Sequence, residues 1–346
     1  MIFGNVVSAG LGQAPARQAA KGAGLPDSVI CTTINKVCAS GMKALVYGSQ
    51  SIALGLHDVV VVGGMESMSG APYLLPNARY GSRLGHGTLL DSVIKDGLWD
   101  PYNNIHMGNC AEKTAKELGI TRADQDEYAL GSYRKAAAAG EAGWLGKEIS
   151  PVTLPGKAGK PGLLVSVDEE LGKLDASKMR NLRPAFGGAT EGTITAANAS
   201  KLNDGAAALV LMSSSRAASM GLRPLARIRG YADAEAAPID FSTAPSKAIP
   251  VALANARVSL KDCHAHEVNE AFSSVAIANT RLLGLDPATV NAHGGAVALG
   301  HPIGASGARI VGTLLSVLTA RDGTLGTASI CNGGGGGTAV ILERLR

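Results

Sequence analysis

The strongest constraint on the fold of this 346-residue chain is a short pattern that occurs twice, near its start and near its end. Two segments, 39–54 (ASGMKALVYGSQSIAL) and 305–318 (ASGARIVGTLLSVL), each predict a helix that opens with Ala-Ser-Gly. Each leads through a short loop to an apolar run, DVVVVGG at 58–64 and TASICNG at 327–333. Uniformly apolar runs of this length are typical of parallel strands that are buried on both faces. The repeat therefore predicts two similar α/β halves that face each other.

The composition indicates packed domains and excludes several function classes. Hydrophobic residues make up 46% of the chain and charged residues 17%, which is typical of a folded protein and not of a disordered one. Only 4% are aromatic, and the net charge of +4 includes no long basic run, which argues against nucleic-acid binding. The mild positive charge suits a phosphate-bearing substrate. No apolar run reaches the roughly 18 residues of a membrane span, and no targeting segment is visible.

The five cysteines are irregularly spaced and include no CxxC pair, so neither a disulfide framework nor a zinc site is indicated. A reducing compartment with one or two reactive thiols is the better interpretation. The segment between the two halves has a different character, with a Gly- and Pro-rich loop at 155–162 and a helical block at 109–139. Thr121 is the expected N-cap of the second helix in that block. We expect this segment to be an insertion that covers the substrate.

Cys38 lies between an extended segment and the first repeated helix, so the helix dipole is expected to favour its thiolate. His301 precedes the second repeated helix much as Cys38 precedes the first. Two halves related by a pseudo-twofold axis would bring both side chains to one interface, and a His beside a Cys is the minimum for an activated thiolate. The alternative is that Cys38 is a small core residue and His301 an ordinary loop residue.

Two further segments carry polar or glycine-rich patterns that need an explanation. Asn269-Glu270 lies between apolar residues, where capping of the following helix is favoured over binding of a ligand or water. The run ICNGGGGG at 330–337 lacks the Lys-Ser/Thr of a phosphate loop and the following helix of a dinucleotide fold. An apolar TAVIL segment follows it and predicts a last strand. The glycines are therefore expected to let the Gly333 N–H reach a substrate oxygen, with Cys331 as a second thiol beside it.

Five motifs in this order, NKVCASGMKA, GGMESMS, VNEAFS, GGAVALGHPIGASGARIV and CNGGGGG, resemble the thiolase family along nearly the whole chain. The branch with mitochondrial acetoacetyl-CoA thiolases is the most similar. The resemblance implies a layered αβαβα fold of the α/β class, built from two similar halves with an inserted loop domain. Residues 1–67, completed by 203–222, would form the N-terminal half, 68–202 the CoA-binding loop domain, and 223–346 the C-terminal half.

The resemblance also implies an activity and its catalytic residues. Two acetyl-CoA molecules would condense reversibly to acetoacetyl-CoA and CoA through an acetyl-cysteine, and short 3-ketoacyl-CoA would be cleaved in reverse. Cys38 would be the nucleophile, His301 its base, and Cys331 the acid/base for the second substrate. Asn269 would hold a water at the thioester oxygen, and the N–H groups of Cys38 and Gly333 would form the oxyanion hole. No redox cofactor is implied.

Contacts to CoA and to a potassium ion are implied in the same way. The CoA-contacting positions are Tyr133, Lys173, Leu174, Asp175, Lys178 and Ser200, and the pantetheine channel would be lined by His106, Met107, Leu182 and Phe186. The potassium ligands would come from Tyr133, Ala196, Ala197, Ala199 and Val297. Carbonyl oxygens suit a hard cation, although such small side chains are equally consistent with simple packing.

The resemblance leaves some alternatives open. A ketoacyl-carrier-protein synthase of the same superfamily is disfavoured by the second thiol, Cys331. An inactive truncated or carrier-type paralogue is disfavoured by the presence of all four catalytic residues. The expected partners are acyl-CoA substrates and further copies of the chain in a homodimer or homotetramer, with no nucleic acid and no membrane. The mitochondrial matrix is the favoured compartment and the cytosol the alternative.

Family chains begin about 40–45 residues before the position that Met1 matches. The sequence therefore predicts that the first strand of the N-terminal half is absent. We expected that strand in the middle of its sheet, where its loss would leave unpaired buried backbone groups at roughly 1–3 kcal/mol each. On that basis residues 1–346 alone are expected to be poorly soluble and nearly inactive.

Overall fold

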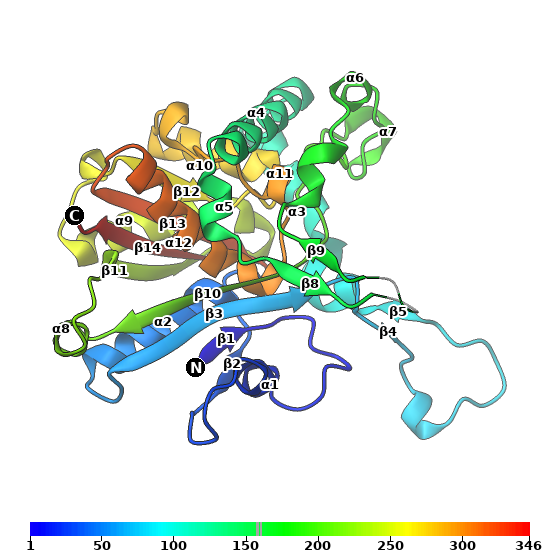
Figure 1. Cartoon of the computed structure of the whole chain (residues 1–346). Coiled ribbons are helices and arrows are strands. Elements are labelled where there is room, and N and C mark those ends of the chain that lie inside the picture. The colour runs from blue at the N-terminus through cyan, green and yellow to red at the C-terminus, as the bar shows by residue number, and fades with distance from the viewer. Residues whose placement is uncertain (157–158, 160) are drawn as a thin grey trace.

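The computed structural model describes residues 1–156, 159 and 161–346, so the predicted loop at 155–162 lies partly outside the described residues. Five layers are stacked (Figure 1). α1 (Pro15–Gly22) covers the outer face of one sheet, and α9 (Ala244–Ala256) covers the outer face of the other. α2 (Ser40–Ala53) and α12 (Ile303–Ala320) pack together between the two sheets. The αβαβα prediction is confirmed.

The two sheets have closely related strand orders. The first sheet has the order β10-β3-β1-β2, from β10 (Asp204–Met212), β3 (Val59–Ser67), β1 (Ile2–Gly4) and β2 (Thr32–Ile34). The second has the order β11-β14-β13-β12, from β11 (Ala226–Glu235), β14 (Gly336–Arg344), β13 (Leu325–Asn332) and β12 (Ala265–Val268). β3 is parallel to β1 and antiparallel to β10, and β13 is parallel to β12 and antiparallel to β14. The two predicted apolar strands are thus each parallel to one neighbour only.

The structure shows no gap at the middle of the first sheet, where the missing strand was expected. β1 pairs directly with β3 on one side, through Ile2 and Val62, and with β2 on the other, through Ile2 and Thr32. The ladder from β10 to β2 is therefore continuous in the described residues.

Paired glycines bring the repeated helices into contact and confirm that the two halves face each other. A Cβ on Gly41 would lie 2.9 Å from the amide nitrogen of Ala308, and one on Gly307 would lie 2.5 Å from that of Met42. These contacts are reciprocal, because each glycine of an Ala-Ser-Gly motif meets the residue that follows the glycine of the other motif. Backbones can approach this closely only where no side chain intervenes. The repeat thus specifies the helix crossing at the centre of the molecule.

The segment between β3 and β10 extends to one side of the layers in Figure 1. The predicted helical block is two helices, and a reciprocal capping box at Thr121 opens the second, as expected. The elements of this segment are β4 (Tyr73–Leu74), η1 (Ala78–Tyr80), β5 (Leu90–Asp91), η2 (Val93–Leu98), β6 (Trp99–Asp100), β7 (Ile105–His106), α3 (Met107–Glu117), α4 (Arg122–Glu141), α5 (Trp144–Glu148), β8 (Val152–Leu154), β9 (Leu163–Val165), η3 (Glu169–Lys173), α6 (Ala176–Met179) and α7 (Gly188–Glu191).

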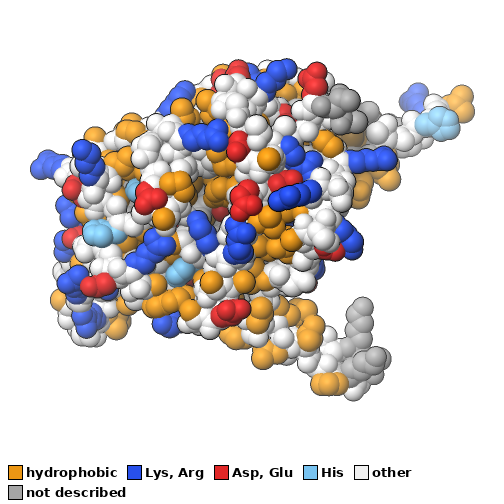
Figure 2. All heavy atoms as spheres, turned by 90° about the horizontal axis from the view of Figure 1, so that it is seen from above, with side chains coloured by type: hydrophobic (Ala, Val, Ile, Leu, Met, Phe, Trp, Pro, Cys, Tyr) orange, Lys and Arg blue, Asp and Glu red, His pale blue; other side chains and the backbone are white. Residues whose placement is uncertain are grey.

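The remaining helices connect and cover the C-terminal half. They are α8 (Ser214–Ser219), η4 (Pro238–Thr243), η5 (Leu260–Asp262), α10 (Ser273–Leu283), η6 (Pro287–Thr289) and α11 (Ala296–Leu299). Among the described residues one helix, α12, has the length and apolar character of a membrane span, and 67% of it is buried inside the fold. Its position between two sheets accounts for that composition. Figure 2 shows Lys and Arg side chains interspersed with Asp and Glu over one face, without a single basic patch.

Candidate active site

A strained turn presents Cys38 at the junction of β2 and α2. Val37 has φ of 47°, a left-handed conformation that costs a β-branched residue about 1–3 kcal/mol. The Asn35 Oδ1 accepts from the Val37 N–H at 2.9 Å. The Ser40 hydroxyl accepts from the Lys36 N–H at 2.8 Å and donates to the Val37 carbonyl at 2.6 Å. These bonds hold the turn and with it the direction of the Cys38 side chain.

Backbone N–H groups and a second thiol lie near Cys38. A Cβ on Gly333 would lie 3.6 Å from a side-chain carbon of Val37, the residue before Cys38, and Cys331 is close enough for the two thiols to influence each other. Burial raises the pKa of the Cys38 thiol to about 11, although the N–H groups of Gly333 and of Cys38 itself act in the opposite direction. The expected thiolate is therefore not the resting form, because desolvation outweighs the helix dipole. A base must take this proton before the sulfur can attack.

His301 is held as a neutral base between α11 and α12. Its Nδ1 lies 2.6 Å from the Ser306 hydroxyl, which donates its proton to the Pro302 carbonyl at 2.9 Å. Since that hydroxyl has only one proton, Nδ1 must be the donor and Nε2 carries the free lone pair. Nε2 is buried and has no partner among the described residues. Burial lowers the pKa of His301 to about 3, so the imidazole is neutral at physiological pH.

Asn269 is also free to bind, which overturns the capping role favoured from the sequence. α10 begins at Ser273, and no side chain caps it. The Asn269 amide is 1% exposed, and neither of its side-chain atoms has a partner among the described residues. Its backbone N–H donates to the Ser329 carbonyl at 3.0 Å, which places it beside β13 near Cys331. A buried amide without a partner suits a bound water or a ligand.

The neighbouring Glu270 is a structural residue and not a cap. Its carboxylate accepts from the hydroxyls of Tyr128 and Ser132 at 2.9 and 2.8 Å. It also accepts from the Asn291 amide and the Val297 N–H, both at 3.0 Å. These four bonds tie α4 to the segments that carry Asn269 and His301.

Cys331 is fully buried near the end of β13. Burial is the main cause that raises its pKa well above the ordinary range, and the nearby Cys38 adds to the effect. The glycines that follow form the turn to β14, with φ of 90° at Gly334 and 96° at Gly335. A Cβ on Gly335 would lie 2.3 Å from the Ala236 carbonyl oxygen, so a side chain is excluded there. The run is a tight turn that places Gly333 against Val37, in the turn that carries Cys38.

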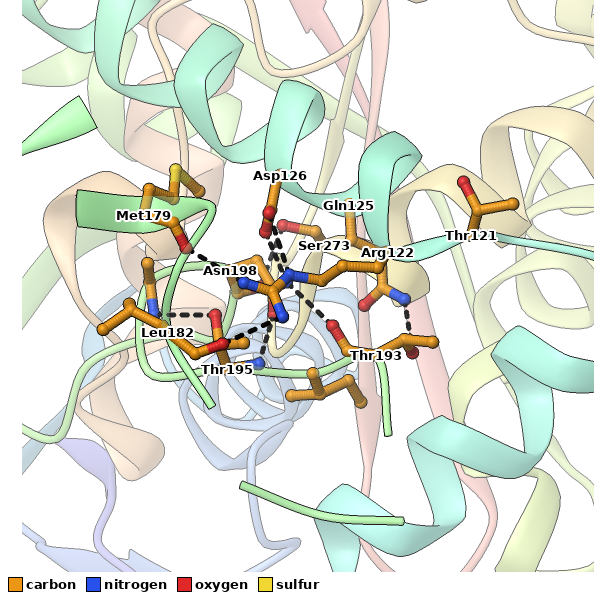
Figure 3. A network of polar contacts seen from close by, with 12 residues as sticks. Thr121, Arg122, Gln125, Asp126, Met179, Leu182, Thr193, Thr195, Asn198 and Ser273 are labelled. Carbon is orange, nitrogen blue, oxygen red and sulfur yellow. Dashed lines mark hydrogen bonds and ion pairs between the residues drawn. The ribbon is translucent and has the colours of Figure 1, made fainter. Parts of the chain in front are cut away.

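Three of the four predicted pantetheine residues gather next to this site. The His106 ring stacks on Phe186 with 4.6 Å between centroids, and Met107 packs in the same apolar cluster as Cys331. A Cβ on Gly333 would face the Met107 sulfur at 3.8 Å. Leu182 lies apart from this cluster, and its carbonyl accepts from Arg122 at 3.1 Å (Figure 3).

The predicted polar CoA contacts are spread over η3, α6 and the loop before β10. Lys173 pairs with Glu169 and Glu170, and Lys178 with Asp175. Asp175 also caps α6 by accepting from the Ser177 N–H at 3.1 Å. Leu174 packs with the cluster that contains the buried Tyr133, and the Ser200 hydroxyl donates to the Ala271 carbonyl at 2.8 Å.

The predicted potassium ligands come together, but a side chain already occupies their oxygens. Tyr133, Val297 and Ala197 belong to one cluster. The Lys201 ammonium donates to the carbonyls of Ala196 and Ala199 at 2.6 and 3.0 Å and lies 3.5 Å from that of Ala197. The residues present therefore do not fit a metal ion at this point. In the described part of the chain no cluster of three or more His, Cys, Asp or Glu side chains could hold one either.

Sequence reasoning missed several residues that build the site. Glu66, in the GGMESMS motif, accepts from the N–H groups of Val6, Val7 and Gly304 and so joins the two halves. Ser306, which orients His301, is the serine of the second Ala-Ser-Gly, and comparison with Ser40 would have indicated its role. Lys201 is the one basic residue after a run of small residues, and this isolated charge could have indicated that its side chain has a specific partner.

A pair of thiols, backbone N–H donors and a neutral imidazole at the junction of two α/β halves define a cysteine-dependent acyltransferase. The chain belongs to the thiolase family: residues 1–215 match the model described as "Thiolase, N-terminal domain" and residues 222–344 the one described as "Thiolase, C-terminal domain".

Similar proteins cover the whole chain. It is 56% identical to acetyl-CoA acetyltransferase 2 of Arabidopsis thaliana, over 100% of the chain and 85% of that protein. It is 54% identical to the mitochondrial acetyl-CoA acetyltransferase of Rattus norvegicus, over 100% of the chain and 80% of that protein. The crystal structure of Acat5 thiolase from Ascaris suum in complex with coenzyme A has a TM-score of 0.93 at 45% identity, covering 99% of this chain and 87% of the other.

Proposed function

We propose that this chain is an acetyl-CoA acetyltransferase, which condenses two acetyl-CoA molecules to acetoacetyl-CoA and CoA and also catalyses the reverse thiolysis. The observation that carries the proposal is that the turn after the buried thiol of Cys331 packs through Gly333 against Val37, next to the thiol of Cys38. Relatives at 51–57% identity over nearly the whole chain bear this name. CoA and its acetyl thioester are the substrates, and no step requires a metal ion.

In the first half-reaction the His301 Nε2 takes the proton of the Cys38 thiol. The sulfur attacks the acetyl carbonyl carbon, and the carbonyl oxygen gains negative charge that the N–H groups of Cys38 and Gly333 stabilise. The bond from the acetyl carbon to the CoA sulfur then breaks. His301 returns the proton to that sulfur, which leaves as CoA, and Cys38 carries the acetyl group.

In the second half-reaction Cys331 passes its thiol proton to the His301 Nε2 and, as a thiolate, removes a methyl proton from a second acetyl-CoA. A thioester makes this proton acidic enough for a thiolate base. The resulting carbanion attacks the acetyl carbon on Cys38, the carbon–sulfur bond breaks, and the Cys38 thiolate takes the proton from His301, which returns all three side chains to their resting forms. His301 and a water on Asn269 stabilise the thioester oxygen of the second substrate, which is consistent with their unpartnered buried polar atoms.

Mass spectrometry of the chain incubated with acetyl-CoA tests this function. An acetyl group is expected on Cys38, with release of one CoA, and Cys38→Ser should abolish both. Thiolysis of acetoacetyl-CoA should be lost in the same variant. A chain that binds CoA without acetylation of Cys38 would instead be a carrier-type paralogue.

We also propose the individual CoA contacts and the division of the chain. Pantetheine passes the apolar cluster of His106, Met107 and Phe186, supported by its packing with Cys331. The phosphates lie near Lys173 and Lys178, and Tyr133, Leu174, Asp175, Ser200 and Leu182 complete the contacts. Residues 1–67 with 203–222, 68–202 and 223–346 form the three units. Lys178→Ala should raise the KM for CoA and leave kcat nearly unchanged.

For assembly and compartment we propose a homodimer or homotetramer in the mitochondrial matrix. The unpaired outer edge of β2 supports assembly, since exposed strand edges favour pairing. The names of relatives include both a mitochondrial and a cytosolic protein. Light scattering of the purified chain and fractionation of source cells test the two points.

A further inference from the structure

The loop that precedes β10 forms a small cage of backbone oxygens around one side-chain cation. The Lys201 Nζ lies 2.6 Å from the Ala196 carbonyl oxygen, 3.0 Å from that of Ala199 and 3.5 Å from that of Ala197. It also lies 5.9 Å from the centre of the Tyr133 ring. An ammonium has three donors and no acceptor, so converging carbonyls satisfy it completely.

The charge of Lys201 has no direct counter-ion. Among the described residues no carboxylate lies within ion-pair distance of Nζ, in contrast to Lys173 and Lys178. Burial lowers the pKa of Lys201 to about 8, which still leaves the ammonium predominant at neutral pH. Partial negative charge on carbonyl oxygens is therefore what holds this cation, as it would hold a free monovalent ion.

A second cation has no room beside the first. Two unit charges 4 Å apart repel by about 4 kcal/mol at the dielectric constant typical near a protein surface. The same three carbonyl oxygens would also have to coordinate both the Lys201 ammonium and the free ion. The ion that the family resemblance implies and the Lys201 ammonium thus compete for a single position.

The cage is coupled to the catalytic segments. The Lys201 carbonyl accepts from the His301 N–H at 3.1 Å, and the Ser200 N–H and hydroxyl both donate to the Ala271 carbonyl. Asn198 belongs to the same loop and is shown in Figure 3: its side-chain amide donates to Asp126 at 2.9 Å, and its backbone carbonyl accepts from the Ser273 hydroxyl at 2.9 Å. The conformation of this loop therefore determines where the backbone of His301 and of the Asn269–Phe272 segment lies.

We propose that Lys201 is a tethered monovalent cation that fills the ion position of the loop and makes this protein independent of potassium. It is a positioning residue, since it acts through the loop on His301 and on the CoA contacts at Ser200 and Tyr133. The catalytic part of this inference rests on the proposed function, whereas occupation of the cage does not.

The first experiment compares salts on the unaltered protein at constant ionic strength. Melting temperature and thiolysis rate are expected to be the same in potassium, sodium and choline chloride. Higher stability or turnover in potassium than in sodium would overturn the proposal. The melting measurement needs no activity, so it separates failure of this inference from failure of the proposed function.

Two substitutions then test what the ammonium does. Lys201→Ala empties the cage, so thiolysis is expected to fall at least tenfold in sodium, and potassium or ammonium ions should restore both the rate and the melting temperature. Lys201→Met keeps the stem but blocks the position, so it should show the same loss without rescue. Lys116→Ala, at a side chain that is 82% exposed, is the matched control and should respond to none of the salts. A Met variant that behaves like the wild type, or an Ala variant with no potassium response, would show that only the stem matters and refute the proposal.

Discussion

At the scale of single residues, the protonation states of three side chains decide how the site works. Cys38 and Cys331 rest as thiols because burial raises both pKa values, and His301 rests as a neutral base because burial lowers its pKa. The hydroxyl of Ser306 selects the tautomer that leaves Nε2 available. The two thiols and the imidazole are thus all neutral at rest.

Cys331→Ser should separate the two half-reactions. A hydroxyl is a far weaker acid/base than a thiol at this pH, so condensation should fall on the order of a hundredfold. Acetylation of Cys38 needs only His301 and the backbone N–H groups and should survive. Single-turnover acetylation and steady-state condensation, measured on the same preparation, check this. An equal loss in both would contradict the separate roles of the thiols.

The resting thiol at Cys38 predicts an unusual pH dependence of alkylation. Below a pKa of about 11 the thiolate fraction rises tenfold per pH unit, so the rate with iodoacetamide should keep rising to about pH 10. N-acetylcysteine, with an ordinary thiol pKa near about 8.5, should level off earlier. Peptide mass spectrometry assigns the modified site. A plateau below pH 8 would mean that Cys38 and His301 already form an ion pair.

At the scale of elements, the contact between α2 and α12 fixes how the turns that carry Cys38 and His301 lie relative to each other. Each helix follows a turn that carries a candidate catalytic residue, Cys38 or His301, and each has a serine in its first turn that donates back to the preceding turn. The glycines at 41 and 307 set the distance between the helix axes. A change at this contact therefore alters both packing and chemistry.

Gly307→Ala is expected to destabilise the protein by about 1–3 kcal/mol, the usual cost of overpacking. The new Cβ would lie 2.5 Å from the Met42 amide nitrogen, which is backbone and cannot move alone. Gly312→Ala on the same helix is the matched control, because a Cβ there meets nothing within 4 Å. That control should be neutral or more stable by about 0.5–1 kcal/mol. Urea unfolding measures both, and equal stability of the two variants would refute the role of the contact.

At the scale of the whole molecule, buried neutral histidines make stability depend on pH. His266 on β12 is 4% exposed, and burial lowers its pKa to about 4. Between that value and its ordinary pKa of about 6.5 the unfolded chain binds a proton that the folded chain does not. Stability due to this residue is therefore lost as pH falls through this window.

The comparison with His266→Gln isolates this contribution. Between pH 7 and pH 5 the wild type should lose about 2 kcal/mol more stability than the variant, which follows from about 1.4 kcal/mol per pKa unit. Urea midpoints at the two pH values measure the difference. The same loss in both proteins would show that His266 is protonated in the folded state or does not titrate. A difference in unfolding free energy between the two proteins that is the same at both pH values reports only the lost contact of His266 with Thr327.

Much of this protein follows from local sequence patterns. The repeated Ala-Ser-Gly helices and the apolar runs behind them determine two facing halves, because helix and strand periodicity are local properties. The position of the thiol before one helix, of the histidine before the other and of the glycine turn after Cys331 could be predicted for the same reason, whereas their chemical roles stay a prediction. Thr121 and its capping box are a further example.

Only the tertiary structure decided the rest, because burial and long-range neighbours control it. Desolvation raises the pKa of Cys38, whereas the helix dipole was expected to lower it. Packing of α4 against Glu270 makes this residue a buried acceptor that connects α4 to its neighbours, and not the helix cap that the sequence favoured. The position of β1 within its sheet depended on pairing with β3, more than 50 residues away in the chain. The carbonyls predicted to bind an ion converge on Lys201 because the loop folds back on itself, a geometry that no spacing in the sequence encodes.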